Sequence, residues 1–504
     1  MIYNDDEKIL KNQGNSTEEE DADLDLDGRV EGRIVNKVEA PLEETPLKVL
    51  LELKGVGSDE GRLGVDLVTI LDISGSMKGT KIEKMQLAMQ FLVQKLGPTD
   101  RLSVVTFNRK AERLCPLRQM TENSRMEIAD QVNALVARSS TNTAAGLKMA
   151  LNILGDRSLT KRRRCAIMLM SDGVEDDESD SASVDVGKVP VYTFGFGSDC
   201  DPDVLREIAK NGGMFSAVSN LDNLSIAFST CLAGLLNVAI DDLTLTIIPL
   251  IGTKFMEVNA GNYQQTKGSN AQPVSVSFGS LYDRESRKVL VKFILPKVDQ
   301  RKGGNVFTIA YKYRVGGKDT FKSHEENKNV SRKPTSTEKE SAEVLAEETR
   351  IMTANSMKEA RLLADAKKLE EARSKLVDAK ASLSEVDAIL KAQLDQLLLF
   401  MASQETYDKQ GRAFALALEA SHDSQRATAS GDAAQAGMFN TPIMDLFIEQ
   451  AMLFDKNPEG YKPPTEEEDR KVVLNKIGST IGLINDIINA IKNNPVAGFF
   501  RGQG

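Results

Sequence analysis

The sequence predicts an α/β domain, an antiparallel β-sandwich and a C-terminal α-helical region within 504 residues. Three patterns indicate these classes. Continuous apolar runs alternate with helically spaced apolar residues over 62–238, which is typical of a mostly parallel sheet covered by helices on both faces. Over 239–315 the apolar residues alternate with polar ones, as in antiparallel strands. Residues 341–399 contain neither Gly nor Pro and are rich in Ala, Leu, Glu and Lys, so they are predicted to be helical.

Composition excludes several classes of function. The formal net charge is −10 and the isoelectric point is about 5.2, whereas general nucleic-acid binding requires a basic face. The four cysteines form no Cys-x-x-Cys pair, which favours a reducing compartment over a disulfide framework. The first residues lack the basic and apolar segments of a secretory signal, and no apolar run is long enough to span a membrane. We therefore expect a soluble cytoplasmic protein that neither binds nucleic acid nor spans a membrane.

The N-terminal part is predicted to contain a tail and two strands. Residues 1–31 are polar and acidic, so we expect a disordered tail. The run Asp23–Gly28 resembles the start of an EF-hand calcium loop, but Ile34 stands where such a loop needs a bidentate glutamate. Two strand candidates within 32–61 are expected to join the sandwich, because a sheet left unpaired at Asp241 would expose its edge. The α/β domain would then be inserted in a loop of the sandwich.

One strand of the predicted α/β domain leads into a loop that carries oxygen ligands. Leu67–Leu71 is an apolar run that predicts a buried parallel strand, and the apolar spacing over 81–96 predicts the helix that follows. Between them, Asp72, Ser74 and Ser76 place one carboxylate and two hydroxyls at the carboxyl end of the strand. In open α/β sheets, ligands bind at this end.

Two further oxygen donors follow in similar settings. Thr141 precedes the helix predicted at Ala145–Leu154, and Asp172 follows the buried strand predicted at Cys165–Met170. Hard oxygen donors of this kind suit a cation such as Mg2+, which keeps some positions for water or for a partner group. The other predicted strands of this domain are Arg101–Phe107 and Val189–Phe196, and its other predicted helices are Arg125–Val136, Pro202–Asn211 and Asp222–Leu236.

The set Asp72-x-Ser74-x-Ser76, Thr141 and Asp172 resembles the metal-ion-dependent adhesion site of von Willebrand factor type A domains. Helix capping by serine and aspartate would explain one of these loops but not all of them. The resemblance implies a Rossmann-like α/β domain in which the two serines and the threonine coordinate Mg2+ or Mn2+. It also implies that the aspartates act directly or through water, and that a carboxylate from a bound partner completes the shell. The expected partner is therefore a protein that offers an Asp or Glu side chain.

The second domain is predicted to be a small antiparallel β-sandwich over 239–315. After it, 316–340 is rich in Lys, Ser, Glu and Asn, which predicts an exposed linker. The predicted sandwich strands, each bounded by turn residues, are Leu243–Ile247, Val274–Phe278, Val289–Phe293 and Phe307–Tyr311.

The helical region over 341–455 allows two arrangements. Its leucines recur at heptad spacing, which fits one continuous coiled-coil seam. The segment also fits helices folded back as hairpins, with turns near 365–368 or 382–384, and we favour this arrangement because the flanking charges do not alternate cleanly. A last amphipathic helix over 466–493 is expected to dock on the protein body. The heptad leucines are Leu362, Leu369, Leu376, Leu383, Leu390 and Leu397.

The order of these parts resembles intracellular von Willebrand A proteins of plants, which include RING-type ubiquitin ligases of the wavy-growth class and carry a Vwaint region. Thr193–Gly197, Gly279–Tyr282 and Met357–Leu362 support this resemblance, which would extend over roughly 45–400. A RING domain binds two zinc ions, each through four Cys or His ligands. The sequence has four cysteines and two histidines, so ligase activity by itself is not expected.

The leading functional hypothesis is a metal-dependent protein–protein interaction module. A second hypothesis is a RING-less regulator or subunit of ubiquitin-ligase complexes, which associates with itself or with other chains through its helical tail. A third, metal-assisted hydrolysis, requires a general base near the metal, and neither His324 nor His422 lies in the predicted α/β domain. We therefore expect no enzymatic activity.

Overall fold

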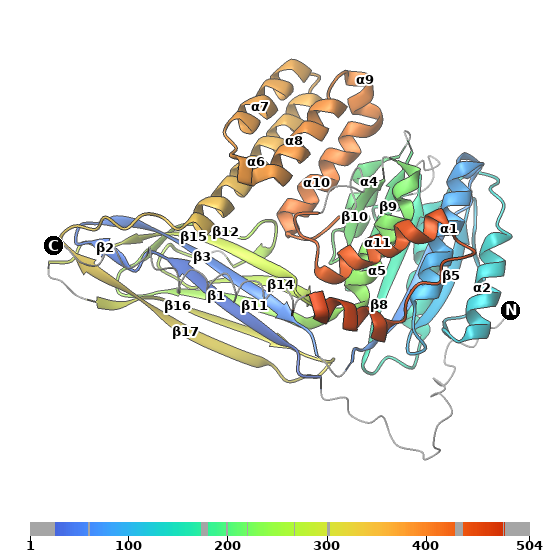
Figure 1. Ribbon diagram of the computed structural model, residues 1–504, viewed down its shortest axis with the longest axis horizontal. Coiled ribbons are helices and arrows are strands. Elements are labelled where there is room, and N and C mark those ends of the chain that lie inside the picture. Colours follow the sequence, from blue (N-terminus) through green and yellow to red (C-terminus); the bar gives the residue numbers. More distant parts are fainter. Residues whose placement is uncertain are drawn as a thin grey trace, which may run out of the picture.

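The computed structural model places an α/β domain beside an elongated β-sandwich, with helices that contact both (Figure 1). Most of the expected acidic tail and the second half of the expected last helix lie outside the described part of the chain. The described residues are 26–58, 61–172, 180–197, 200–218, 220–266, 268–299, 303–428, 437–476 and 478.

The α/β domain is built on a sheet with the strand order β10-β9-β8-β4-β5-β6, and β7 also pairs with β5. The central strand β4 pairs in parallel with β5 and β8, and all of its residues are buried. This burial explains why its sequence is a nearly continuous apolar run. β6 and β7 run antiparallel to β5. The strands are β4 Gly64–Asp72, β5 Arg101–Phe107, β6 Ala111–Arg113, β7 Arg118–Gln119, β8 Arg163–Ser171, β9 Val191–Phe196 and β10 Met214–Val218.

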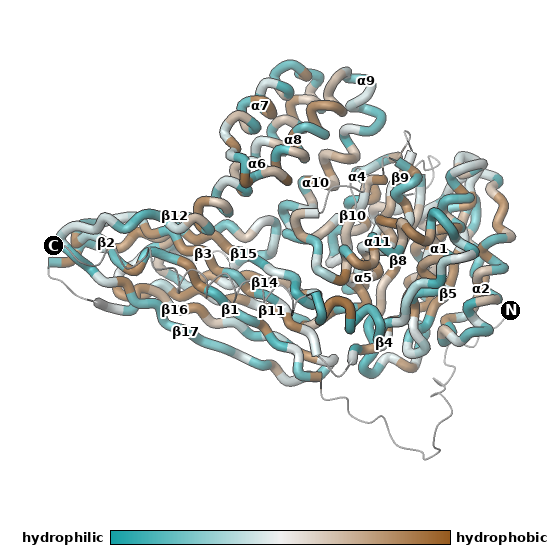
Figure 2. The backbone as a smooth tube through the Cα atoms, in the orientation of Figure 1, coloured by the Kyte–Doolittle hydropathy of each residue, from teal (hydrophilic) through white to brown (hydrophobic). Residues whose placement is uncertain are grey.

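Helices cover both faces of this sheet. α1 (Thr80–Lys95), α2 (Glu122–Asn133) and α5 (Leu224–Leu236) bury apolar side chains against one face. α3 (Thr143–Asp156) and α4 (Pro202–Ala209) do so against the other face. Figure 2 shows that the apolar residues concentrate in the strands and in the helix surfaces that meet them. The predicted α/β class is confirmed.

The sandwich consists of two sheets, with the strand orders β1-β3-β15-β12 and β13-β14-β11-β16-β17-β2. Apolar side chains from both sheets form one core between them. The α/β domain follows β3 and precedes β11, so it is inserted between two strands of the sandwich. The strands are β1 Arg29–Asn36, β2 Glu39–Pro41, β3 Thr45–Val56, β11 Val238–Pro249, β12 Lys254–Asn259, β13 Gln264–Gln265, β14 Val274–Tyr282, β15 Ser286–Leu295, β16 Gly303–Arg314 and β17 Lys322–Lys333.

The linker expected over 316–340 is wrong for its central part, because β17 occupies 322–333. This strand pairs with β16 along nearly its whole length. Val330 and Arg332 are its only buried residues, and the other side chains are half-buried or exposed. The sequence of this strand therefore shows no alternation of apolar and polar residues. Its structure is determined by backbone pairing with β16.

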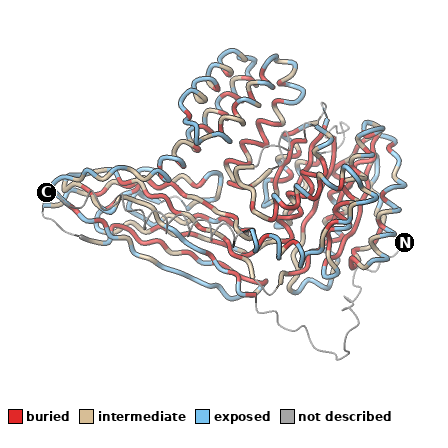
Figure 3. Tube along the Cα trace, in the orientation of Figure 1, coloured by how far each residue is buried: buried red, intermediate tan, exposed pale blue. Residues whose placement is uncertain are grey.

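The helical region begins with a hairpin and not with one long helix. α6 (Ala342–Asp365) and α7 (Leu369–Ala381) pack against each other, and the turn between them holds Lys367 in the left-handed region, with φ 63°. α8 (Ala388–Phe400) then packs on α7. The heptad leucines therefore form no single coiled-coil seam. Figure 3 shows that the outer faces of this group are exposed while its inner faces are buried. After the short helices α9 (Gln404–Thr406) and η4 (Tyr407–Gly411) come α10 (Arg412–Ser424) and α11 (Pro442–Lys456).

The later helices return to the α/β domain. α10 packs on β10, and α11 packs on α5. Residues 466–476 form a further helix, whose Asp469 carboxylate lies 2.5 Å from the Lys95 ammonium of α1. Lys95 also donates to Gln450 of α11 at 3.0 Å. The described part of the last helix is thus docked on the body. None of the described helices is both long and apolar enough to cross a bilayer.

Candidate metal centre

Three loops meet at the carboxyl edge of the α/β sheet. Strand β4 ends at Asp72, and its neighbour β8 ends at Ser171, so Asp72 and Asp172 leave adjacent strands at the same edge. The loop that precedes α3 is tied to the first loop by backbone hydrogen bonds. Gly75 N donates to Ser139 O at 2.8 Å, and Arg138 N donates to Ile73 O at 2.7 Å. These bonds bring the loop of Thr141 beside the loop of the serines.

Asp72 is fully buried, and both of its carboxylate oxygens accept hydrogen bonds. Oδ1 accepts from the Ser74 backbone N–H at 2.8 Å, and Oδ2 accepts from the Ser171 hydroxyl at 2.9 Å. Burial and, to a smaller extent, the negative charge of Asp172 raise the pKa of the Asp72 carboxyl to about 6, against the opposing effect of the hydrogen bonds from Ser74 and Ser171. A nearby cation would favour the charged form of this carboxyl.

The three hydroxyls lie in the two tied loops. The Ser74 and Ser76 hydroxyl oxygens are 3.0 Å apart. Ser74 is buried and Ser76 is exposed, since the short helix η1 (Gly75–Met77) turns the chain outward. Thr141 is buried, 5% exposed, just before the Asn142 side chain that caps α3. Of the three hydroxyl residues, Ser76 is thus the one exposed to solvent, whereas Ser74 and Thr141 are buried.

Asp172 is fully buried and is only partly satisfied. Its Oδ2 accepts from the Lys81 ammonium of α1 at 2.9 Å. Its Oδ1 is buried and has no hydrogen-bond partner among the described residues. Leaving a buried carboxylate oxygen without a partner is costly, so this atom indicates a place for a cation or for a donor that the described residues do not supply.

The donor set fits Mg2+ or Mn2+, because it consists of carboxylate and hydroxyl oxygens. Within the described ranges, no cluster of three or more His, Cys, Asp or Glu side chains is placed to hold a metal ion. The candidate centre instead combines two carboxylates with neutral hydroxyls. Neither histidine belongs to it, since His324 lies on β17 and His422 on α10.

Sequence reasoning missed two residues at this edge, Ser171 and Lys81. Ser171 could have been found, because it is the polar residue that ends the apolar run of β8, directly before Asp172. Lys81 could not have been found, since nothing in the sequence distinguishes it from Lys78 or Lys84 as a partner of Asp172.

Residues 66–229 match the von Willebrand factor type A domain family. The chain contains a von Willebrand factor type A domain. Residues 384–452, from α8 to α11, match the Vwaint family, described as VWA / Hh protein intein-like. Two of the motifs that suggested plant relatives, Gly279–Tyr282 and Met357–Leu362, lie outside both matches. Type A domains are a family of protein-interaction modules and commonly bind a divalent metal.

Curated relatives resemble part of this chain. The E3 ubiquitin-protein ligase WAV3 of Arabidopsis thaliana is 31% identical over 257 residues, 48% of this chain and 32% of the relative. The probable E3 ubiquitin-protein ligase WAVH2 of the same plant is 30% identical over 47% of this chain and 33% of the relative. The protein sll0103 of Synechocystis is 29% identical over 38% of this chain and 45% of the relative. The chain thus spans between a third and a half of these relatives.

A solved structure shares the fold over most of the chain. A von Willebrand factor type A protein from Catenulispora acidiphila superimposes with a TM-score of 0.60 at 16% identity. The superposition covers 80% of this chain and 97% of that protein. The likeness therefore includes elements outside the type A domain.

Proposed function

We propose that the type A domain is a metal-dependent protein-interaction module that captures an acidic side chain of a partner through Mg2+ or Mn2+. The observation that carries this proposal is the buried Asp172 Oδ1, which has no hydrogen-bond partner among the described residues. It lies at the same sheet edge as Asp72 and the paired hydroxyls of Ser74 and Ser76. A divalent cation would satisfy these oxygens together.

Each residue has a distinct part in this proposal. Ser74, Ser76 and Thr141 would hold the ion through neutral hydroxyls, and Asp72 and Asp172 would neutralise it directly or through water. The bound cation would supply a positive centre that accepts a partner carboxylate. Because three of the five donors are uncharged, the ion keeps enough positive charge to attract that carboxylate. Ser171 orients Asp72 through its hydrogen bond to Oδ2.

Titration calorimetry with Mg2+ and Mn2+ tests this proposal. We expect Ser74→Ala combined with Ser76→Ala to weaken metal binding by roughly 10–100-fold or more, since two coordinating oxygens are lost. Partners captured on the wild-type chain should be released by a chelator, and the double variant should not capture them. Ser382→Ala removes an exposed hydroxyl of the helical hairpin and serves as the control with unchanged binding. Wild-type metal affinity in the double variant would exclude this mechanism.

A second candidate function is association with ubiquitin-ligase complexes. The matches to relatives named as E3 ubiquitin ligases favour it. The printed sequence has too few Cys and His residues for the zinc sites of a RING, so we propose a role as regulator or subunit and no ligase activity of its own. All four cysteines are free thiols, which supports an intracellular place of action.

The helices α6 and α8 offer exposed apolar residues for such an association. Met352 is 64% exposed and Leu399 is 63% exposed. Met352→Glu with Leu399→Glu should abolish capture of RING-bearing proteins, scored by mass spectrometry, and should leave metal binding unchanged. The heptad residues Leu376 and Leu383 are unsuitable for this test because both are buried, and a glutamate there would unfold the hairpin. Undiminished capture by the double variant would exclude Met352 and Leu399 as the contact residues.

A further inference from the structure

Lys81 brings a positive charge into the candidate metal centre. It lies in the first turn of α1, and its ammonium contacts Asp172 Oδ2 at 2.9 Å. Asp172 is completely buried, whereas the Lys81 side chain is 20% exposed. The ammonium thus reaches from the surface to a buried carboxylate. It occupies one of the two oxygens of Asp172 and leaves Oδ1 without a partner among the described residues.

The space for this contact depends on Gly197, the residue that follows β9. A Cβ atom at Gly197 would lie 3.0 Å from the Lys81 Nζ and 3.2 Å from its Cε. Gly197 also has a φ of +94°, which other residues rarely adopt. The lack of a side chain at Gly197 therefore leaves room for the Lys81 ammonium. Since the Lys81 side chain is 20% exposed, solvent reaches the lysine beside the buried carboxylate of Asp172.

The charges at this edge are unbalanced. Among the described residues, Lys81 pairs with Asp172, and the Asp72 carboxylate has no cation partner, so the two aspartates and Lys81 together carry one net negative charge. A divalent cation added to this set would leave one net positive charge. A carboxylate from a partner would then make the site neutral. Without Lys81, the metal alone would neutralise the two aspartates, and a partner carboxylate would add an uncompensated negative charge.

We propose that Lys81 is an internal competitor of the divalent cation, which weakens binding of the metal alone and makes the metal-loaded site selective for an acidic partner. This inference rests on the proposed metal-dependent function. Lys81 neutralises Asp172 while the metal is absent, so the metal must displace the ammonium or share the carboxylate with it. Once the metal is bound, the retained positive charge favours a ligand that carries a carboxylate.

The test is a titration of Lys81→Gln with Mg2+ and with Mn2+, by calorimetry on the full chain. Glutamine keeps a polar side chain of similar length and removes the charge. We expect metal affinity to increase about tenfold, which corresponds to about 1.4 kcal/mol. Lys84→Gln is the matched control, since Lys84 lies one turn along α1 and pairs with Asp222 at 2.6 Å. Its metal affinity should equal that of the wild type.

Lys81→Arg separates charge from shape. It keeps the positive charge, so its metal affinity should not exceed that of the wild type. A tenfold increase in the metal affinity of Lys81→Arg would overturn the electrostatic explanation.

Thermal unfolding gives a second readout. Without metal, Lys81→Gln should unfold at a lower temperature than the wild type, because Asp172 loses its ion pair. Mg2+ should then raise the Tm of Lys81→Gln more than that of the wild type.

The outcomes distinguish this inference from the function on which it rests. Metal binding by the wild type with equal or weaker binding by Lys81→Gln would overturn the competition and leave the proposed function intact. Metal binding by Lys81→Gln but not by the wild type would support both. If neither the wild type nor any Lys81 variant binds metal, the proposed function and this inference both fail.

Discussion

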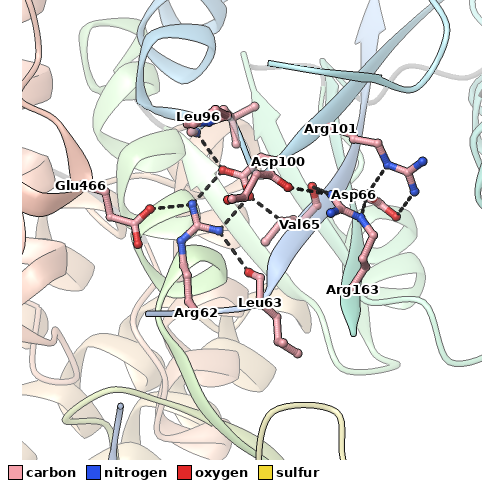
Figure 4. Close-up of polar contacts among 12 residues, drawn as sticks. Arg62, Leu63, Val65, Asp66, Leu96, Asp100, Arg101, Arg163 and Glu466 are labelled. Carbon is pink, nitrogen blue, oxygen red and sulfur yellow. Dashed lines mark hydrogen bonds and ion pairs between the residues drawn. The ribbon is translucent and has the colours of Figure 1, made fainter. Parts of the chain in front are cut away.

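Strand β4 carries a buried aspartate near each end, and their surroundings differ sharply. Asp66, near the amino end, accepts from the guanidinium groups of Arg101 at 2.8 Å and Arg163 at 2.7 Å (Figure 4). A third guanidinium group, that of Arg157, donates to it at 2.6 Å. Asp72, at the carboxyl end, contacts no cation among the described residues and accepts only from a backbone amide and a hydroxyl. The first carboxylate holds neighbouring strands together. The second is the carboxylate that we propose as a partner of an external cation.

The burial of His422 predicts that the stability of the fold depends on pH. Burial and, to a smaller extent, the charge of the Arg350 guanidinium, which approaches Nδ1 at 3.2 Å, lower the pKa of its imidazole to about 3. Its Nε2 faces Gln393 Oε1 at 3.0 Å, so the neutral ring carries its proton on Nε2. The unfolded chain takes up this proton below about pH 6.5, while the folded chain does not. Stability is therefore lost as the pH falls from about 6.5 toward 3, by up to about 1.4 kcal/mol per pH unit.

Urea unfolding of the wild type and of His422→Gln checks this expectation. The free energy of unfolding of the wild type should fall more steeply between about pH 7 and pH 5 than that of the variant, because the variant has no imidazole to protonate. The carboxyl groups titrate in both proteins and cancel in the comparison. Equal slopes would contradict the assignment of a buried neutral histidine.

At the scale of the element, the heptad leucines have different environments despite their even spacing. Leu376 of α7 and Leu397 of α8 are fully buried between the helices, while Leu362 of α6 is 52% exposed. The turn at Lys367 reverses the chain, so successive heptads lie on different surfaces. Sequence period alone therefore does not reveal which leucines form the core.

Two leucine truncations test the hairpin. Leu376→Ala should lower the free energy of unfolding by about 2–5 kcal/mol, because it opens a cavity in the hairpin core. Leu362→Ala should change it by no more than about 0.5 kcal/mol, since its side chain is largely in solvent. Chemical denaturation of both variants measures the difference. Similar losses for the two would favour the continuous seam that the heptads suggested.

The strand ends and the helices of the α/β domain could be predicted because they are encoded locally. The apolar run of β4 ends at Asp72, and the run of β8 ends before Asp172, so the loop positions of the candidate ligands follow from the sequence. The contact of Lys81 with Asp172 could not be predicted, because it depends on how α1 sits beside β8. Strand β17 was missed for a related reason, since its pairing with β16 leaves no apolar pattern.

At the scale of the whole molecule, the three parts meet at one buried cluster. Arg426, just after α10, donates from Nε to Glu285 Oε1 at 2.9 Å, and Arg287 of β15 contacts the same oxygen at 3.0 Å. The Arg426 guanidinium lies 4.2 Å from the ring centre of Tyr282 in the sandwich. The Tyr282 hydroxyl is in turn 2.8 Å from that of Tyr192 in the type A domain. This cluster joins the helical region, the sandwich and the α/β domain.

Glu285→Gln should therefore destabilise the whole molecule. It removes the carboxylate that balances two buried guanidinium groups, and breaking a buried pair of this kind costs about 3–5 kcal/mol. Glu385→Gln is the control, because Glu385 is exposed and pairs only with Lys391 at the surface, so no measurable loss is expected. Urea unfolding, followed in the type A domain and in the helices separately, measures both variants. Loss of stability in one part alone would contradict the joining role of the cluster.

The insertion of the type A domain between β3 and β11 determines the order in which the chain can fold during synthesis. Leu50 of β3 lies opposite Leu290 of β15, so the two strands are about 240 residues apart along the chain. A ribosome therefore synthesises the complete type A domain before it synthesises β15, the second partner strand of β3. Until then β1 and β3 form at most a two-stranded hairpin, which is marginal by itself and has an open edge. The nascent protein thus carries a complete type A domain while the sandwich is unfinished, and the helices that pack on both parts are synthesised last.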